Sequence, residues 1–196
     1  MGTRMFAAVY PPAEVIEDLA AYVDPRRQAD DRLRWSGPGN WHITTLFADS
    51  VPERSLDPLI EGLAALAERT APFDVRIAGS LAFPNPYEAR VLGLDITTGV
   101  AQLGHLSRTA RAAASHAGIV PDGSRFHPHL TLARAKRPFE ATKWLTVLGS
   151  FPGWTFRAAE LVLLESYLRQ GPTGGPRHVV LERFRFTADA PGPAVP

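Results

Sequence analysis

The chain has 196 residues, of which 45% are hydrophobic and 21% are charged, as in an ordinary globular protein with a buried core. Its formal net charge of +1 excludes a surface that coats nucleic acid electrostatically, so we expect any nucleic-acid contact to be local, at an end or a single nucleotide. Cysteine is absent, which excludes disulfides, thiol catalysis and thiolate metal sites. The lack of cysteine is compatible with a reducing cytosol, and the sequence shows no membrane-spanning apolar run and no signal peptide, so we expect a cytoplasmic protein. We also expect a monomer, although the sequence itself does not reveal the oligomeric state.

Short apolar runs alternate along the chain with segments of helical periodicity, and many prolines and glycines separate them. The apolar runs predict strands at residues 5–10, 32–35, 41–47, 73–83, 90–96, 126–134, 156–168 and 177–186. The helical spacing predicts helices at about residues 12–25, 56–66, 100–117 and 139–148. The last residues, 188–196, are expected to form a disordered tail.

This order of elements predicts an α+β fold, with antiparallel sheets that carry helices on one face. The order also indicates an approximate internal duplication, although no longer sequence repeat accompanies it.

The predicted strand at residues 126–134 carries a polar pair on one face. His129 and Thr131 are two residues apart, so both project from the same side, while Leu130 and Leu132 project from the other. A strand with one polar and one apolar face is typical of the wall of a cleft.

The same arrangement occurs once more, in the predicted strand at residues 41–47. There His42 and Thr44 share a face, again within an apolar run. Two pairs with the same offset require a common explanation.

Two histidines, each followed by a hydroxyl, suit the cleavage of a phosphodiester without a metal. One neutral imidazole can take a proton from the nucleophile while the other, protonated, gives one to the leaving oxygen. Both states are accessible because the reference pKa of histidine is about 6.5. The threonine hydroxyls can donate to phosphate oxygens, and Arg134 can add positive charge where negative charge develops.

At these residues the sequence resembles the 2H phosphoesterases, a family with paired His-x-Ser/Thr-x motifs. The matching motifs are His42-Ile43-Thr44-Thr45 and His129-Leu130-Thr131-Leu132. Further landmarks are similar to its RNA 2′,3′-cyclic phosphodiesterase branch, once called 2′-5′ RNA ligases. They are an opening strand ending in proline, Arg34-Trp35 before Asn40-Trp41-His42, Phe47, Ala82-Phe83-Pro84, the run from Phe126 to Arg134, and Leu164-Glu165-Ser166 before Gly175-Pro176-Arg177.

The resemblance implies a bilobal fold over residues 1–187, with two similar lobes of antiparallel sheet, helices outside and a central cleft. It implies a catalytic domain that hydrolyses RNA 2′,3′-cyclic phosphate ends to 2′-phosphates, with no metal and no cofactor. The implied partners are RNA 3′ ends or oligonucleotides that carry this phosphate. The implied roles are His42 as acid, His129 as base, Thr44, Thr131 and Arg134 as phosphate ligands, and Phe47 as a stacking surface for the terminal base.

Several points stay open at this stage. The acid and base roles of the two histidines could be reversed. His127 is a possible residue of the cleft rim, and His178, where the family often has an aromatic residue, is expected at the surface. Thr45 and Asp49 also depart from the family pattern, in place of an apolar residue and a glycine.

The alternative functions are an RNA-end or nucleotide-binding module with little or no turnover, and a related enzyme acting on a small cyclic phosphate or a 2′-5′ linkage. The same site could also run in reverse as a ligase. A metal centre is disfavoured, because neither motif contains an acidic residue and no His-Glu-x-x-His occurs.

Overall fold

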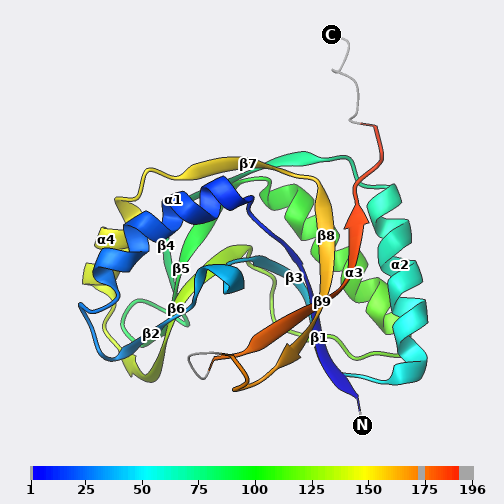
Figure 1. Ribbon diagram of the computed structural model, residues 1–196, viewed down its shortest axis with the longest axis horizontal. Coiled ribbons are helices and arrows are strands. Elements are labelled where there is room, and N and C mark those ends of the chain that lie inside the picture. Colours follow the sequence, from blue (N-terminus) through cyan, green and yellow to red (C-terminus); the bar gives the residue numbers. More distant parts are fainter. Residues whose placement is uncertain (1, 172–174, 190–196) are drawn as a thin grey trace.

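The computed structural model describes residues 2–171 and 175–189 and consists of two antiparallel sheets with helices around them (Figure 1). The four-stranded sheet has the order β3-β1-β8-β9, and the five-stranded sheet has the order β2-β6-β5-β4-β7. The strands are β1 (Thr3–Val9), β2 (Leu33–Trp35), β3 (Ile43–Val51), β4 (Phe73–Phe83), β5 (Ala89–Thr98), β6 (His129–Phe139), β7 (Trp154–Ala158), β8 (Glu160–Tyr167) and β9 (Arg177–Arg185). The helices are α1 (Ala13–Val23), α2 (Leu56–Glu68), α3 (Val100–His116) and α4 (Thr142–Gly149).

The helices lie on the outer sides of the two sheets, which confirms the predicted α+β class (Figure 1). Helices α2 and α3 pack on each other and on the four-stranded sheet, whereas α4 packs on β4 and β5. The chain interleaves the two halves, because α3 follows β5 of the five-stranded sheet and yet packs on β3 of the other. One buried apolar cluster accordingly contains residues of both sheets.

Strand β1 shows how the four-stranded sheet is built, with apolar side chains on both faces. Met5, Ala7 and Val9 belong to the main core, beside residues of the helices. Phe6 and Ala8 point the other way and form a second small cluster with Val162 and Leu164 of β8. The second face therefore has an apolar floor of its own, and the candidate site lies above it.

The predicted strand at residues 156–168 was wrong, because two strands of different sheets occupy this segment. Strand β7 pairs with β4, and β8 pairs with β1 and β9. In β7 buried and exposed residues alternate, whereas four consecutive residues of β8, Leu161 to Leu164, are buried. The burial pattern changes at the junction, but no glycine or proline marks it in the sequence.

Other boundaries also differ from the prediction. Strand β3 begins at Ile43, directly after His42, and runs on to Val51 rather than ending at residue 47. Strand β6 begins at His129 rather than at residue 126 and runs on to Phe139, so helix α4 begins only at Thr142. Pro128 explains the late start, because proline has no N–H to donate to the ladder.

Part of the predicted disordered tail, residues 190–196, lies outside the described residues, as do residues 172–174 of the loop between β8 and β9. Just before that limit, the backbone N–H of Ala188 donates to the carbonyl of Thr70 at 3.2 Å. Among the described residues, no helix has the length and apolar character needed to cross a membrane.

Candidate active site

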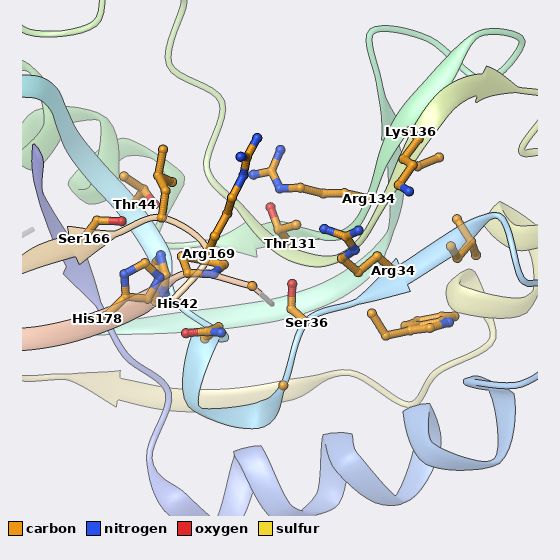
Figure 2. A pocket seen from close by; sticks show the side chains of 18 of the residues that line it. Arg34, Ser36, His42, Thr44, Thr131, Arg134, Lys136, Ser166, Arg169 and His178 are labelled. Atoms are coloured by element: carbon orange, nitrogen blue, oxygen red, sulfur yellow. The ribbon is translucent and has the colours of Figure 1, made fainter. Parts of the chain in front are cut away.

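A cleft of about 1430 Å³ is lined by residues from both sheets, and both motif strands contribute to it (Figure 2). Of the seven side chains singled out from the sequence, six line this cleft and one, His127, does not. The six are His42, Thr44, Phe47, His129, Thr131 and Arg134. Two motifs that are far apart in the sequence therefore lie in one cavity.

A β-bulge in β3 explains why Thr44 and Phe47 both reach the cleft although they are three residues apart. In the ladder with β1, Ala8 lies opposite Thr44 and Ala7 lies opposite Leu46, so Thr45 is an extra residue. Its hydroxyl is buried and donates to the carbonyl of Ala7 at 3.1 Å. The polar residue at this unusual position is thus satisfied inside the fold, and the bulge returns Phe47 to the cleft face.

The second motif strand contains the same bulge at the equivalent position. In the ladder with β5, Gly93 lies opposite Thr131 and Leu92 lies opposite Ala133, so Leu132 is the extra residue. Arg134, three residues beyond Thr131, therefore reaches the cleft as Phe47 does in β3. The two motifs match in their backbone irregularity as well as in their sequence.

Gly93 is required by this second bulge. A Cβ added there would lie 2.6 Å from the carbonyl oxygen of Leu130, closer than real Cβ contacts allow.

His42 lies in an aromatic environment on the apolar floor of the four-stranded sheet. Phe6 stacks on its ring with centroids 4.8 Å apart, and the ring of Tyr10 lies 5.2 Å away. His178 of β9 packs edge-on against it, with ring centroids 5.7 Å apart (Figure 2). Nδ1 of His42 is enclosed and has no hydrogen-bond partner within the described residues.

These surroundings lower the pKa of His42 to about 3. Burial is the main cause, because it disfavours the charged imidazolium, and the positive charges of His178, His129 and Arg134 add to it. Without an anion in the cleft, His42 is therefore neutral at neutral pH.

His129 is held differently, by a hydrogen bond to the backbone of His127. Its Nδ1 donates to the carbonyl of His127 at 2.8 Å, and its ring packs edge-on against Phe83 at 4.9 Å. Because a carbonyl can only accept, the neutral ring carries its proton on Nδ1 and leaves the lone pair on Nε2. Burial lowers the pKa of His129, while the bond to the His127 carbonyl acts in the opposite direction.

His127 lies before β6 begins and has partners outside the cleft. Its Nε2 lies 3.1 Å from Oδ1 of Asp95, and its ring packs edge-on against Phe83 at 5.7 Å. Its backbone carbonyl, rather than its side chain, connects it to the candidate site.

Several basic residues of the cleft were not assigned by the sequence analysis. Arg4 donates to Asp49 at 2.8 Å, and its guanidinium lies 4.4 Å from the ring centre of Phe47. The other basic lining residues beyond Arg134 are Arg32, Arg34, Lys136, Arg137 and Arg169. Of the described residues that line the cleft, one is a carboxylate, Asp31. The net charge of +1 gave no signal of this concentration, because acidic residues elsewhere balance it.

His178 was expected at the surface and instead lines the cleft beside His42. The pairing of β9 with β8 places it there, opposite Ser166, which also lines the cleft. The sequence could not reveal this position, because it depends on which strands pair.

In the part of the chain that the structure describes, no three His, Cys, Asp or Glu side chains come together as a set of metal ligands. Besides the Asp31 carboxylate, the groups that the cleft offers to a ligand include imidazoles, hydroxyls, guanidiniums and an ammonium. These donors suit an anion such as a phosphate.

Residues 11–169 match the family model described as the 2′-5′ RNA ligase superfamily. Relatives named RNA 2′,3′-cyclic phosphodiesterase occur in Aquifex aeolicus (29% identical, 63% of this chain) and Geobacillus stearothermophilus (31% identical, 87% of this chain). The aligned stretch spans only 64% and 54%, respectively, of the length of these two relatives. A relative of the same name in Thermus thermophilus is 31% identical over 95% of this chain and 91% of its own length.

A solved structure shows the same fold over nearly the whole chain. The crystal structure of the Thermus thermophilus protein TT0787 matches with a TM-score of 0.76 and 28% identity, covering 95% of this chain and 100% of that one.

Proposed function

The chain belongs to the 2′-5′ RNA ligase superfamily, and from this we propose that it hydrolyses RNA 2′,3′-cyclic phosphate ends to 2′-phosphates, with His42 and His129 as acid and base and without a metal. The observation that carries the proposal is the meeting of two bulged His-x-Thr strands in one basic cleft. The names of the curated relatives support the choice of substrate.

His129 is the proposed base. Its hydrogen bond to the His127 carbonyl holds the proton on Nδ1, so Nε2 is free to accept a proton from water. The lowered pKa of His129 keeps this nitrogen unprotonated at neutral pH. As the water oxygen forms its bond to phosphorus, the proton passes to Nε2.

His42 is the proposed acid, and the substrate itself must charge it. In the free protein its pKa is about 3, but a bound phosphate places negative charge beside the imidazolium and raises that pKa. As the bond between phosphorus and the 3′-oxygen breaks, the proton of His42 passes to that oxygen. The product carries a 2′-phosphate, and proton exchange with solvent restores both histidines.

Thr44, Thr131 and Arg134 are the proposed phosphate ligands. The two hydroxyls reach the cleft from opposite sheets, so they can donate to different non-bridging oxygens. Arg134 adds a charge that stabilises the transition state more than the ground state if negative charge on the oxygens grows.

Phe47 is the proposed surface for the terminal base. Its ring belongs to the cleft wall, and the Arg4 guanidinium already covers part of it. An aromatic ring and a guanidinium plane are both surfaces on which a base stacks.

The test is incubation of the protein with an oligonucleotide ending in a 2′,3′-cyclic phosphate, with and without EDTA, and identification of the product. We expect a 2′-phosphate in both cases. Activity that disappears with EDTA would refute the metal-independent mechanism. Tight binding of the oligonucleotide without any product would show that the protein is a binding module rather than an enzyme.

A further inference from the structure

The basic residues of the cleft extend well beyond the site of the proposed chemistry. Lys136 follows Thr131 by five residues along β6, and because Leu132 is the extra residue of the bulge the separation corresponds to about 13 Å at the usual rise of a strand. The cleft volume of about 1430 Å³ also exceeds the upper range of roughly 1,000 Å³ for pockets that hold one small ligand. The cleft has room for more than a terminal nucleotide.

Two arginines lie directly opposite each other on this side of the cleft. Arg34 of β2 and Arg134 of β6 are partners in the antiparallel ladder, so their Cα atoms are about 4.5–5.5 Å apart. Like charges directly opposite each other destabilise a sheet. Figure 2 shows both side chains in the cleft near Thr131, with Lys136 farther along.

The described residues provide no acidic partner for these cations. Arg34, Arg134 and Lys136 make no ion pair there, whereas Arg32 at the same end is paired with Asp30 at 2.6 Å. Arg34 and Lys136 are also exposed, so neither contributes to the core. An arrangement that costs stability and is not neutralised within the fold is suited to a polyanion that enters from outside.

We propose that the β2–β6 side of the cleft binds the phosphodiester upstream of the reacting group through Arg34 and Lys136, so that the protein prefers an oligonucleotide 3′ end to a mononucleoside 2′,3′-cyclic phosphate. This inference rests on the proposed function and extends it to the rest of the substrate. An RNA 3′ end continues in the 5′ direction with one phosphodiester per nucleotide, and phosphate contacts of this kind position a chain without reading its sequence.

In this proposal the two ends of the cleft bind different parts of the substrate. Phe47 and Arg4 belong to the four-stranded sheet and receive the terminal base, whereas Lys136 belongs to the five-stranded sheet and receives the backbone. Asp31 lines the cleft too, and it limits the favourable charge near Arg32.

The test compares kcat/KM for a mononucleoside 2′,3′-cyclic phosphate with that for a short oligonucleotide ending in the same group. The variant is the double substitution Arg34→Gln and Lys136→Gln. The control is Arg108→Gln, which removes an exposed arginine on α3 outside the cleft. We expect the wild type to have a higher kcat/KM for the oligonucleotide than for the mononucleoside. In the double variant, the kcat/KM for the oligonucleotide divided by that for the mononucleoside should fall by about tenfold or more, because charge-assisted phosphate contacts are lost.

The salt dependence gives an independent readout. Each lost phosphate contact should reduce the slope of log affinity for a single strand against log salt by about 0.7. An unchanged ratio and slope in the double variant would overturn the inference, as would equal hydrolysis of both substrates by the wild type.

Failure of the proposed function gives a different result, namely no hydrolysis of either substrate by the wild type. In that case the affinity for a labelled oligonucleotide ending in a 2′-phosphate still tests the backbone contacts. A loss of affinity in the double variant alone supports them, and equal affinity in all three proteins overturns them.

Discussion

Acidification should destabilise the folded protein through the imidazole of His42. Its pKa is about 3 in the folded chain and about 6.5 in an unfolded one, so the unfolded state binds the proton more tightly. The contribution of neutral His42 to the free energy of unfolding is therefore fully present above about pH 6.5, and it is lost as the pH falls toward 3.

The magnitude follows from these two pKa values. Between about pH 8 and pH 5, the difference in proton binding by His42 lowers the free energy of unfolding by about 2 kcal/mol. Burial also lowers the pKa values of His129 and His178, so both act in the same direction and the wild type should lose more than this amount.

The assay is urea unfolding of the wild type and of His42→Asn at both pH values. The substitution changes stability at either pH, but the comparison of pH dependences isolates the titration of His42. We expect the variant to lose about 2 kcal/mol less than the wild type on acidification. His105→Asn, on the exposed face of α3, is the control and should retain the wild-type loss. Equal losses in His42→Asn and the wild type would refute the buried, neutral histidine.

Three further predictions test the roles of particular residues. If His42 is the acid, a small diester with a p-nitrophenolate leaving group should restore turnover to His42→Ala but not to His129→Ala, since that leaving group needs no proton; equal rescue of both would reject the assignment. Gly93→Ala should lower the free energy of unfolding by about 1–3 kcal/mol through overpacking at the bulge. Gly123→Ala, where nothing lies near an added Cβ, should be close to neutral in the same urea titration. Thr45→Val should cost about 1 kcal/mol by removing its buried hydrogen bond, and unchanged thermal unfolding would show that this bond contributes nothing.

The sequence predicted the motif strands because their pattern is local. His42 and Thr44, like His129 and Thr131, alternate with buried apolar residues over a few positions, and this periodicity does not depend on the rest of the fold. Strict alternation would nevertheless place Phe47 and Arg134 on the opposite face from the threonines. Phe47 was predicted from the family resemblance alone, whereas Arg134 was already proposed as a positive charge beside the second motif. The bulges at Thr45 and Leu132 supply the physical reason why both reach the cleft.

The missed features depend on contacts between distant segments. His178 reaches the cleft only because β9 pairs with β8, and Arg34 faces Arg134 only because β2 pairs with β6. The break between β7 and β8 was missed for a related reason, since the two strands belong to different sheets and no turn residue separates them. Net charge was uninformative because it sums over the surface, whereas the cleft gathers cations from several strands.

The two halves of the site share one backbone design but surround their histidines differently, and this difference supports their different proposed roles. Both motifs have a histidine, a threonine two residues on and a bulge immediately after it. His129 has a carbonyl that fixes its tautomer and leaves Nε2 as an acceptor, which suits a base. His42 has aromatic rings and an enclosed Nδ1 with no described partner, so it is neutral near neutral pH, and in the proposed mechanism the bound phosphate is what allows it to carry a proton. In the proposed mechanism the proton on His42 is present when a phosphate is bound, close to the oxygen that leaves. In the free protein His42 stays neutral, so the fold is not destabilised by a buried imidazolium.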